Sequence, residues 1–64
     1  MSILPNREFA QRKGWTHQVE WLDDGRPCFV RCTSGAEADT KADNLKKLGC
    51  NVTVIDLRDA LQLH

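Results

Sequence analysis

The sequence contains no tyrosine, few aromatic residues and no excess of charge of either sign. Nine basic side chains balance nine acidic ones. Phosphate contacts supply most of the affinity of a general nucleic-acid binder, so the missing basic excess counts against that class of protein. No apolar run approaches the ~20 residues that span a bilayer. The first fifteen residues also lack the apolar core of a secretory signal.

Cysteine is scarce, with only Cys28, Cys32 and Cys50. An odd number of cysteines without a signal segment predicts reduced thiols in a cytoplasmic protein. On one strand, the spacing of Cys28 and Cys32 puts their Cα atoms roughly 13 Å apart, whereas a disulfide needs less than about 7 Å. Together with His17, the three cysteines lack the close-paired ligand spacing of zinc modules. We therefore expect no metal and no cofactor.

Signatures of catalysis are missing as well. The sequence has no glycine-rich phosphate loop, HExxH motif or Ser/His/Asp signature. The adjacent carboxylates of Asp23 and Asp24 are explained by turn formation. A pairing of His17 with Cys32 lacks a third orienting group and a cleft. We therefore expect a non-enzymatic protein without catalytic residues.

What is present predicts one small domain over residues 1–64. A chain of this length buries only roughly 60% of its unfolded surface, so a stabilising partner is a common addition. In residues 1–14, Asn6 as N-cap and Gly14 as terminator predict a short helix over residues 7–13. A disordered arm is the alternative.

A β-hairpin follows over residues 15–33. Trp15, His17, Val19 and Trp21 alternate with mostly polar residues, which predicts a strand. Asp24-Gly25 predicts a two-residue type I′ turn, which leads into a second strand over residues 28–33. The turn sets the register, so Val19 faces Val30, Trp21 faces Cys28 and His17 faces Cys32. This side of the sheet, with Trp15, is the predicted core face.

A helix and a third strand complete the predicted fold. The capping box Ser34-x-x-Glu37 predicts a helix over residues 35–48, with Ala38, Ala42 and Leu45 along its apolar stripe. A strand over residues 50–57 follows, and a helix that joins parallel strands makes a right-handed crossover by default. The fold class is therefore α+β, a three-stranded ββαβ sheet of order 2-1-3 with the helix on one face. Residues 58–64 either extend the third strand or make one helical turn.

The opposite sheet face is half apolar, whereas a solvated face is polar at nearly every position. Three coverings remain open: the N-terminal or C-terminal segment of the chain, a second copy of the chain, or a different macromolecule. Exposed apolar patches rimmed by polar groups often mark interaction sites. The candidate protein-binding residues are therefore those of this face: Glu20, Leu22, Phe29, Arg31 and Ile55.

A basic and aromatic cluster offers an alternative. Bases could stack on its aromatic side chains while its cations contact phosphates. A plain solvated basic stretch explains the same residues without a ligand. The candidate nucleic-acid-binding residues are Arg7, Arg12, Lys13, Trp15 and Arg31.

The ββαβ order over residues 15–57 is similar in outline to that of small phage-encoded proteins that inhibit host machinery, including RNA polymerase inhibitors and anti-CRISPR proteins. Element order alone carries this resemblance, without a diagnostic motif. It implies a protein that occupies a surface of a larger partner and uses no cofactor. We therefore expect a cytoplasmic protein-binding or regulatory module that docks through its open sheet face or an edge strand. A homodimer and a nucleic-acid-binding accessory protein are the alternatives, and no membrane contact is expected.

Overall fold

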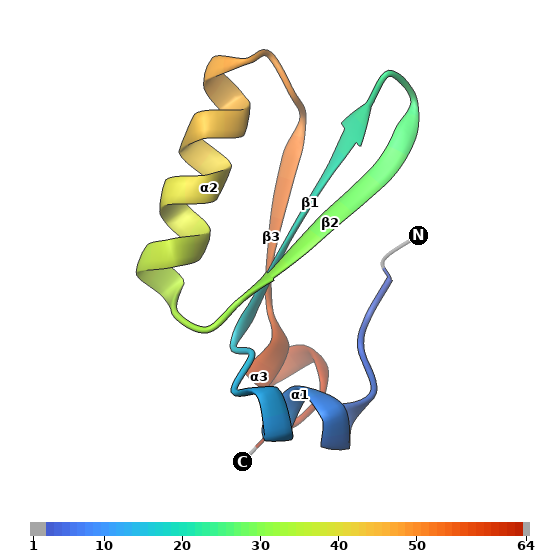
Figure 1. Ribbon diagram of the computed structural model, residues 1–64, viewed down its shortest axis with the longest axis vertical. Helices are drawn as coiled ribbons and strands as arrows, with labels where there is room; N and C mark the ends of the chain where they lie inside the picture. Colours follow the sequence, from blue (N-terminus) through green and yellow to red (C-terminus); the bar gives the residue numbers. More distant parts are fainter. Residues whose placement is uncertain (1–2, 64) are drawn as a thin grey trace.

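The computed structural model describes residues 3–63 and shows a three-stranded sheet with one long helix on one side (Figure 1). The sheet order is β2-β1-β3, and both outer strands run antiparallel to β1. This confirms the predicted α+β class and strand order. The elements are α1 (Arg7–Lys13), β1 (His17–Asp23), β2 (Arg26–Cys32), α2 (Gly35–Lys47), β3 (Val52–Asp56) and α3 (Leu57–Ala60).

The hairpin forms as its turn residues predict. Asp24 has a φ of 53° and Gly25 a φ of 81°, the positive angles that a type I′ turn requires at both positions. Val19 lies opposite Val30 and Trp21 lies opposite Cys28, which confirms the predicted register. Both strands reach closer to the turn than predicted, because the short turn lets pairing continue through Asp23 and Arg26.

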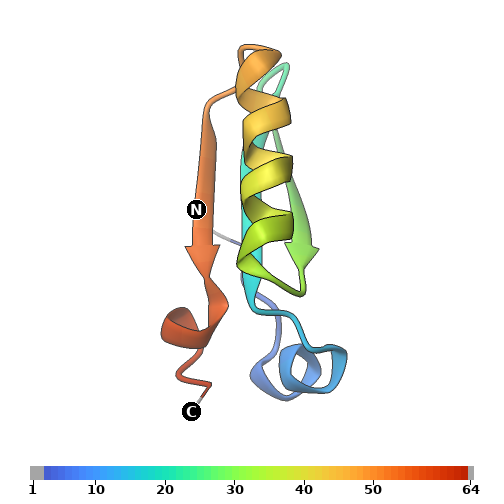
Figure 2. The same cartoon turned by 90° about the vertical axis from the view of Figure 1, so that its left-hand side faces the viewer.

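The core lies between the sheet and α2. The Ser34 hydroxyl accepts a hydrogen bond from the backbone N–H of Glu37 and caps the helix. The predicted stripe is buried against the sheet, and the core cluster consists of Val19, Cys32, Ala38, Ala42 and Leu45, with Trp21, Val30, Cys50 and Val52 at its margin. Leu48 lies beyond the end of α2 and is exposed, so it does not extend the stripe. Figure 2 shows α2 lying over the middle of the sheet.

The third strand is shorter than predicted, because it begins at Val52 instead of Cys50 and ends at Asp56 instead of Leu57. Its last residue, Asp56, caps α3, because its Oδ1 atom accepts a hydrogen bond from the Arg58 backbone N–H at 2.9 Å. The prediction that Leu57 lies in the third strand was wrong. Leu57 instead begins α3 and is fully buried. Of the two alternatives for the C-terminal tail, the helical turn is the one that forms.

The short helices α1 and α3 lie at the end of the sheet opposite the hairpin turn (Figure 1). The Asn6 side chain accepts hydrogen bonds from the Glu8 and Phe9 backbone N–H groups, and Gly14 ends α1 with a φ of 74°. This confirms the predicted helix rather than the disordered arm. No helix within residues 3–63 has the length and apolar character needed to cross a membrane.

Trp15 does not lie on the core face, contrary to the alternation argument. It precedes β1, which begins at His17, and its backbone N–H bonds to the Ala10 carbonyl at 3.0 Å. Its ring contacts Phe9 and Arg31 instead of the core cluster. The strand alternation therefore ends at His17, because the turn after α1 decides where Trp15 points.

Candidate functional site

The candidate site is the sheet face away from α2, here called the second face. It carries the even-numbered side chains of β1 and the odd-numbered side chains of β2 and β3. The N-terminal segment of the chain runs along this side (Figure 1). The predicted protein-binding residues share this face: Glu20 and Leu22 from β1, Phe29 and Arg31 from β2, and Ile55 from β3.

The centre of the second face is a hydrogen-bond network around Gln18, whose exposed fraction is 0%. The Gln18 amide nitrogen donates to the Ile3 carbonyl at 2.6 Å and to Glu20 Oε2 at 2.7 Å. Its amide oxygen accepts from Arg31 Nε at 3.0 Å. All polar atoms of this buried amide therefore have partners. The alternation marked Gln18 only as a polar position, and nothing local in the sequence reveals its partners.

The N-terminal segment covers part of the second face. The Ile3 backbone N–H donates to Glu20 Oε2 at 3.1 Å, so side chains of β1 bind both the N–H and the C=O of Ile3. Ile55 is half-buried, but Leu22 remains 55% exposed and Phe29 remains 38% exposed. The N-terminal segment therefore covers only part of the second face, and the apolar side chains of Leu22 and Phe29 near the hairpin turn stay exposed to solvent.

Beside this network, cationic and aromatic side chains form a continuous stack. The Arg31 guanidinium lies between two rings, 5.0 Å from the centroid of Trp15 and 4.4 Å from that of Phe29. The Phe9 ring also contacts Trp15, with its centroid 5.6 Å from that of the Trp15 ring. The Lys13 ammonium lies 5.5 Å from the Phe9 ring. Each exposed cation–aromatic contact contributes about 0.5–1 kcal/mol.

The stack joins part of the predicted nucleic-acid-binding set. Lys13, Trp15 and Arg31 belong to it, whereas Arg7 and Arg12 lie exposed on α1 outside it. Phe9 links the members but was absent from the predicted set. Its position before the Gly14 turn was the available signal, because that turn folds α1 back toward the start of β1.

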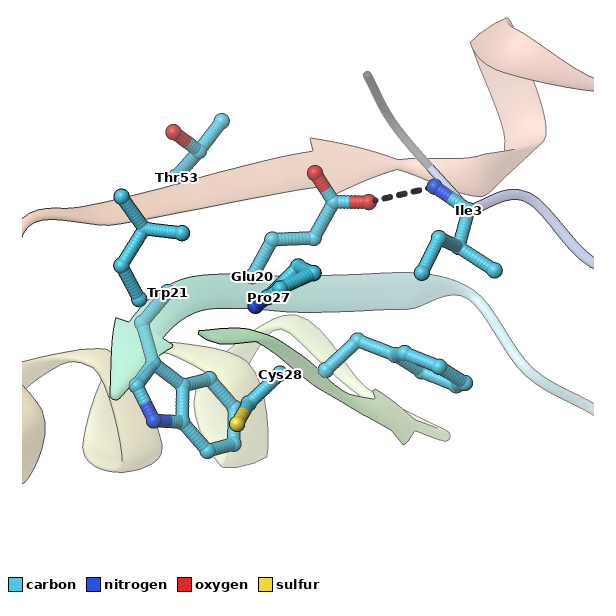
Figure 3. A pocket seen from close by; sticks show the side chains of 8 residues that line it. Ile3, Glu20, Trp21, Pro27, Cys28 and Thr53 are labelled. Atoms are coloured by element: carbon cyan, nitrogen blue, oxygen red, sulfur yellow. Dashed lines mark hydrogen bonds between the residues drawn. The ribbon is translucent and has the colours of Figure 1, made fainter. Parts of the chain in front are cut away.

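A shallow hollow of about 250 Å³ lies between the N-terminal segment and the hairpin end of the second face (Figure 3). Glu20 and Thr53 project on its side of the sheet, while the Trp21 and Cys28 side chains project toward the helix side. At those two positions the strand backbone therefore forms the floor. The lining residues are Ile3, Glu20, Trp21, Leu22, Pro27, Cys28, Phe29 and Thr53.

Across the core face, Cys32, His17 and Asp56 form one row through the three strands. These are the residue types of a thiol hydrolase, but each is engaged otherwise. Burial raises the pKa of the Cys32 thiol, so the nucleophilic thiolate is disfavoured. His17 Nδ1 lies 2.7 Å from the Thr16 hydroxyl, and the Asp56 carboxylate accepts both side-chain hydrogen bonds of Arg58. The His17 and Asp56 side chains are therefore held by other partners instead of by one another.

The remaining chemical candidates are the thiols. All three cysteines are free, and Cys28 and Cys32 lie on one strand as predicted. Within residues 3–63, no group of three or more histidine, cysteine or acidic side chains is placed to hold a metal ion. The second face, with its exposed Leu22 and Phe29 side chains, is the candidate protein-binding surface.

Comparisons of the chain with protein-family models, with curated proteins and with solved structures gave no match.

Proposed function

We propose that this chain is a non-enzymatic protein-binding module that docks through the second face. The observation that carries the proposal is the exposure of Leu22 and Phe29 beside a hollow whose rim includes the Glu20 carboxylate. Apolar patches with a polar rim are typical of protein interaction sites. Aromatic residues and arginine are enriched among the side chains that carry most of the binding energy.

The neighbouring Arg31 strengthens this proposal because it is held in place before any partner arrives. Gln18 fixes its Nε atom, and the Trp15 and Phe29 rings lie against its guanidinium. Ordering a flexible side chain at an interface costs about 0.5–1.5 kcal/mol. A preformed Arg31–Phe29 pair avoids much of this cost, so it is suited to act as a rigid anchor.

The similarity in element order to phage-encoded inhibitors suggests one form of this function, the occupation of a surface on a larger host protein. We place the interaction in a reducing cytoplasm, where three free thiols persist.

The test is affinity capture from a lysate of the source cell, with and without nuclease, followed by titration of the purified partner. Phe29→Asp and Leu22→Asp each add a charge to the second face. Leu48→Asp is the matched control, because Leu48 is 77% exposed and lies beyond α2, away from this face. Circular dichroism should show that all three variants fold.

We expect a partner that survives nuclease, is lost with Phe29→Asp and Leu22→Asp, and is retained with Leu48→Asp. Equal binding by all three variants would refute docking through the second face.

A second candidate function is binding of single-stranded nucleic acid along the stack. The supporting observation is that Lys13, Phe9, Trp15 and Arg31 form one continuous cation–aromatic surface. Fluorescence anisotropy with a labelled oligothymidylate tests this function. Binding should weaken steeply with salt, with a log–log slope of about −0.7 per phosphate contact, and Trp15→Ala should reduce it. Binding that ignores salt would refute this second function.

A further inference from the structure

The outer side of β3 is an open sheet edge. Only β1 pairs with β3, because the sheet order is β2-β1-β3. In Figure 2, β3 lies at the margin of the sheet, beside α2 rather than beneath it. No other element of the described chain pairs with this side of the strand.

The turn geometry determines which backbone groups face outward. A two-residue turn closes on a pair that exchanges both hydrogen bonds, here Asp23 and Arg26. Bonds from a central strand then alternate between its two neighbours. Gln18 and Glu20 therefore bond to β3, through Ile55 and Thr53. The 2.9 Å bond from the Leu57 N–H to the Thr16 carbonyl continues this alternation.

The N–H and C=O groups of Val52 and Val54 consequently point away from the sheet, as does the N–H of Asp56, whose carbonyl belongs to the start of α3. Such unpaired groups are a template for another strand, and proteins usually protect them with proline, charges or bulges. The edge of β2 has this protection, since Pro27 lacks an N–H and Arg31 adds a charge. By contrast, β3 is β-branched at every position from Val52 to Ile55.

A groove of about 410 Å³ runs between this edge and α2. Val54 forms its exposed apolar part, with 41% of its surface accessible. On the helix side, Asp39 and Asp43 line the groove together with Lys46. The wall therefore carries two carboxylates and one ammonium group, which favours a cationic occupant.

We infer that the β3 edge binds an extended basic segment of another protein as an added strand. Alternate side chains of an added strand point to opposite sheet faces. Its lysine or arginine side chains would lie over Val54 toward Asp39 and Asp43. Its apolar side chains would lie on the other face, next to Ile55.

A second copy of the chain fits this edge poorly. Antiparallel self-pairing about Val54 brings the same α2 flank of both copies together. Each flank carries two carboxylates and one ammonium group, so two flanks of the same net charge would meet, and like charges oppose association. The net acidic flank therefore selects a foreign basic strand.

The test is a ¹⁵N NMR titration with a short capped peptide in which lysine alternates with valine. A peptide in which glutamate alternates with valine is the control. We expect the lysine peptide to shift the amide signals of Val52, Val54 and Asp56 and to slow their hydrogen exchange. Equal affinity for the glutamate peptide, or shifts confined to the second face, would overturn the inference.

Two variants separate the contributions of backbone and charge. Val54→Pro removes an outward N–H without removing a bond to β1, and it should abolish peptide binding. The combined change Asp43→Asn and Asn44→Asp preserves net charge and composition but moves one carboxylate around α2. It should weaken binding about two- to fivefold, as expected for one exposed charge pair.

Folding is monitored by the protection of the β1–β3 amide protons, which both variants should retain. Unchanged peptide binding by Val54→Pro, or by the carboxylate swap, would overturn the inference. A concentration-dependent dimer in sedimentation that Val54→Pro dissociates would also overturn it, because the edge would then belong to a second copy.

Discussion

Replacing Gln18 by leucine removes the network at the centre of the second face while nearly preserving side-chain volume. Three hydrogen bonds are lost, and two of them involve the charged groups of Glu20 and Arg31. Bonds to charged groups contribute about 1.5–3 kcal/mol each and a neutral one about 0.5–1.5 kcal/mol. Two effects reduce this loss. The Ile3 carbonyl, Glu20 and Arg31, which lose their partner, lie near the surface and regain hydrogen bonds to water. The leucine side chain also buries additional apolar surface.

The net cost of Gln18→Leu should therefore be about 2–3 kcal/mol. This is a large fraction of the roughly 3–10 kcal/mol expected for a chain of this size. Urea denaturation followed by tryptophan fluorescence measures it. Thr53→Val is the control on the same face, with an expected change within about 0.5 kcal/mol. A loss below about 0.5 kcal/mol for Gln18→Leu would refute the network as a source of stability.

The variant Gln18→Glu tests the same network through the pH dependence of stability. Burial, the Glu20 carboxylate and the Ile3 carbonyl all disfavour ionisation of the introduced carboxyl, whereas Arg31 alone favours it, so its pKa should lie above the ordinary value. A carboxyl with a raised folded pKa destabilises the protein once pH rises above the unfolded value of about 4.3. The variant should therefore be closest to wild type in stability below that pH. A constant difference across pH 3 to pH 8 would contradict this reasoning.

Three further predictions concern single side chains. The Arg58 hydrogen bonds lower the pKa of Asp56 to about 2, so its contribution to stability is present above about pH 4 and is lost as pH falls toward about 2. A ¹³C NMR titration should place the carboxyl midpoint there, and a midpoint near 4 would contradict the pairing. Burial raises the pKa of Cys32, so at neutral pH two thiols should react quickly with a disulfide reagent and Cys32 only after unfolding. Three equally fast thiols would show that Cys32 is accessible. Trp21→Ala should cost about 3 kcal/mol, the low end for such deletions, because Trp21 is half-buried. Near-native stability in urea would place Trp21 outside the core.

Local chemistry accounts for the parts of the fold that the sequence predicts well. Asp24 and Gly25 adopt the positive φ angles that set the hairpin register, and this register assigns each strand residue to a face. The Ser34 side chain caps α2, which begins at the predicted residue. These signals act within a few residues of one another, so no knowledge of the packed chain is needed to interpret them.

The candidate site was only partly predictable. The residues of the second face follow from the register, but their coverage depends on the N-terminal segment, which is distant in sequence. Ile3 reaches Gln18 and Glu20 across more than a dozen residues. Trp15 was predicted on the core face but contacts Arg31 of the second face, because the turn at Gly14 orients it and strand alternation does not. Leu57 was wrongly assigned to the strand because Asp56 caps a helical turn, which the β-branched residues before it do not predict.

The sequence by itself determined the order of the elements, the hairpin register and the helix stripe, because each depends on turn chemistry, capping or periodicity. Only the tertiary structure decided how the second face is shared between the chain and solvent. The guanidinium of Arg31 finds Gln18, Trp15 and Phe29 only when β1, β2 and the turn after α1 come together. The open edge of β3 likewise exists only because β1 takes the central position in the sheet. Both surfaces arise from contacts between distant segments, and such contacts leave no local pattern in the chain.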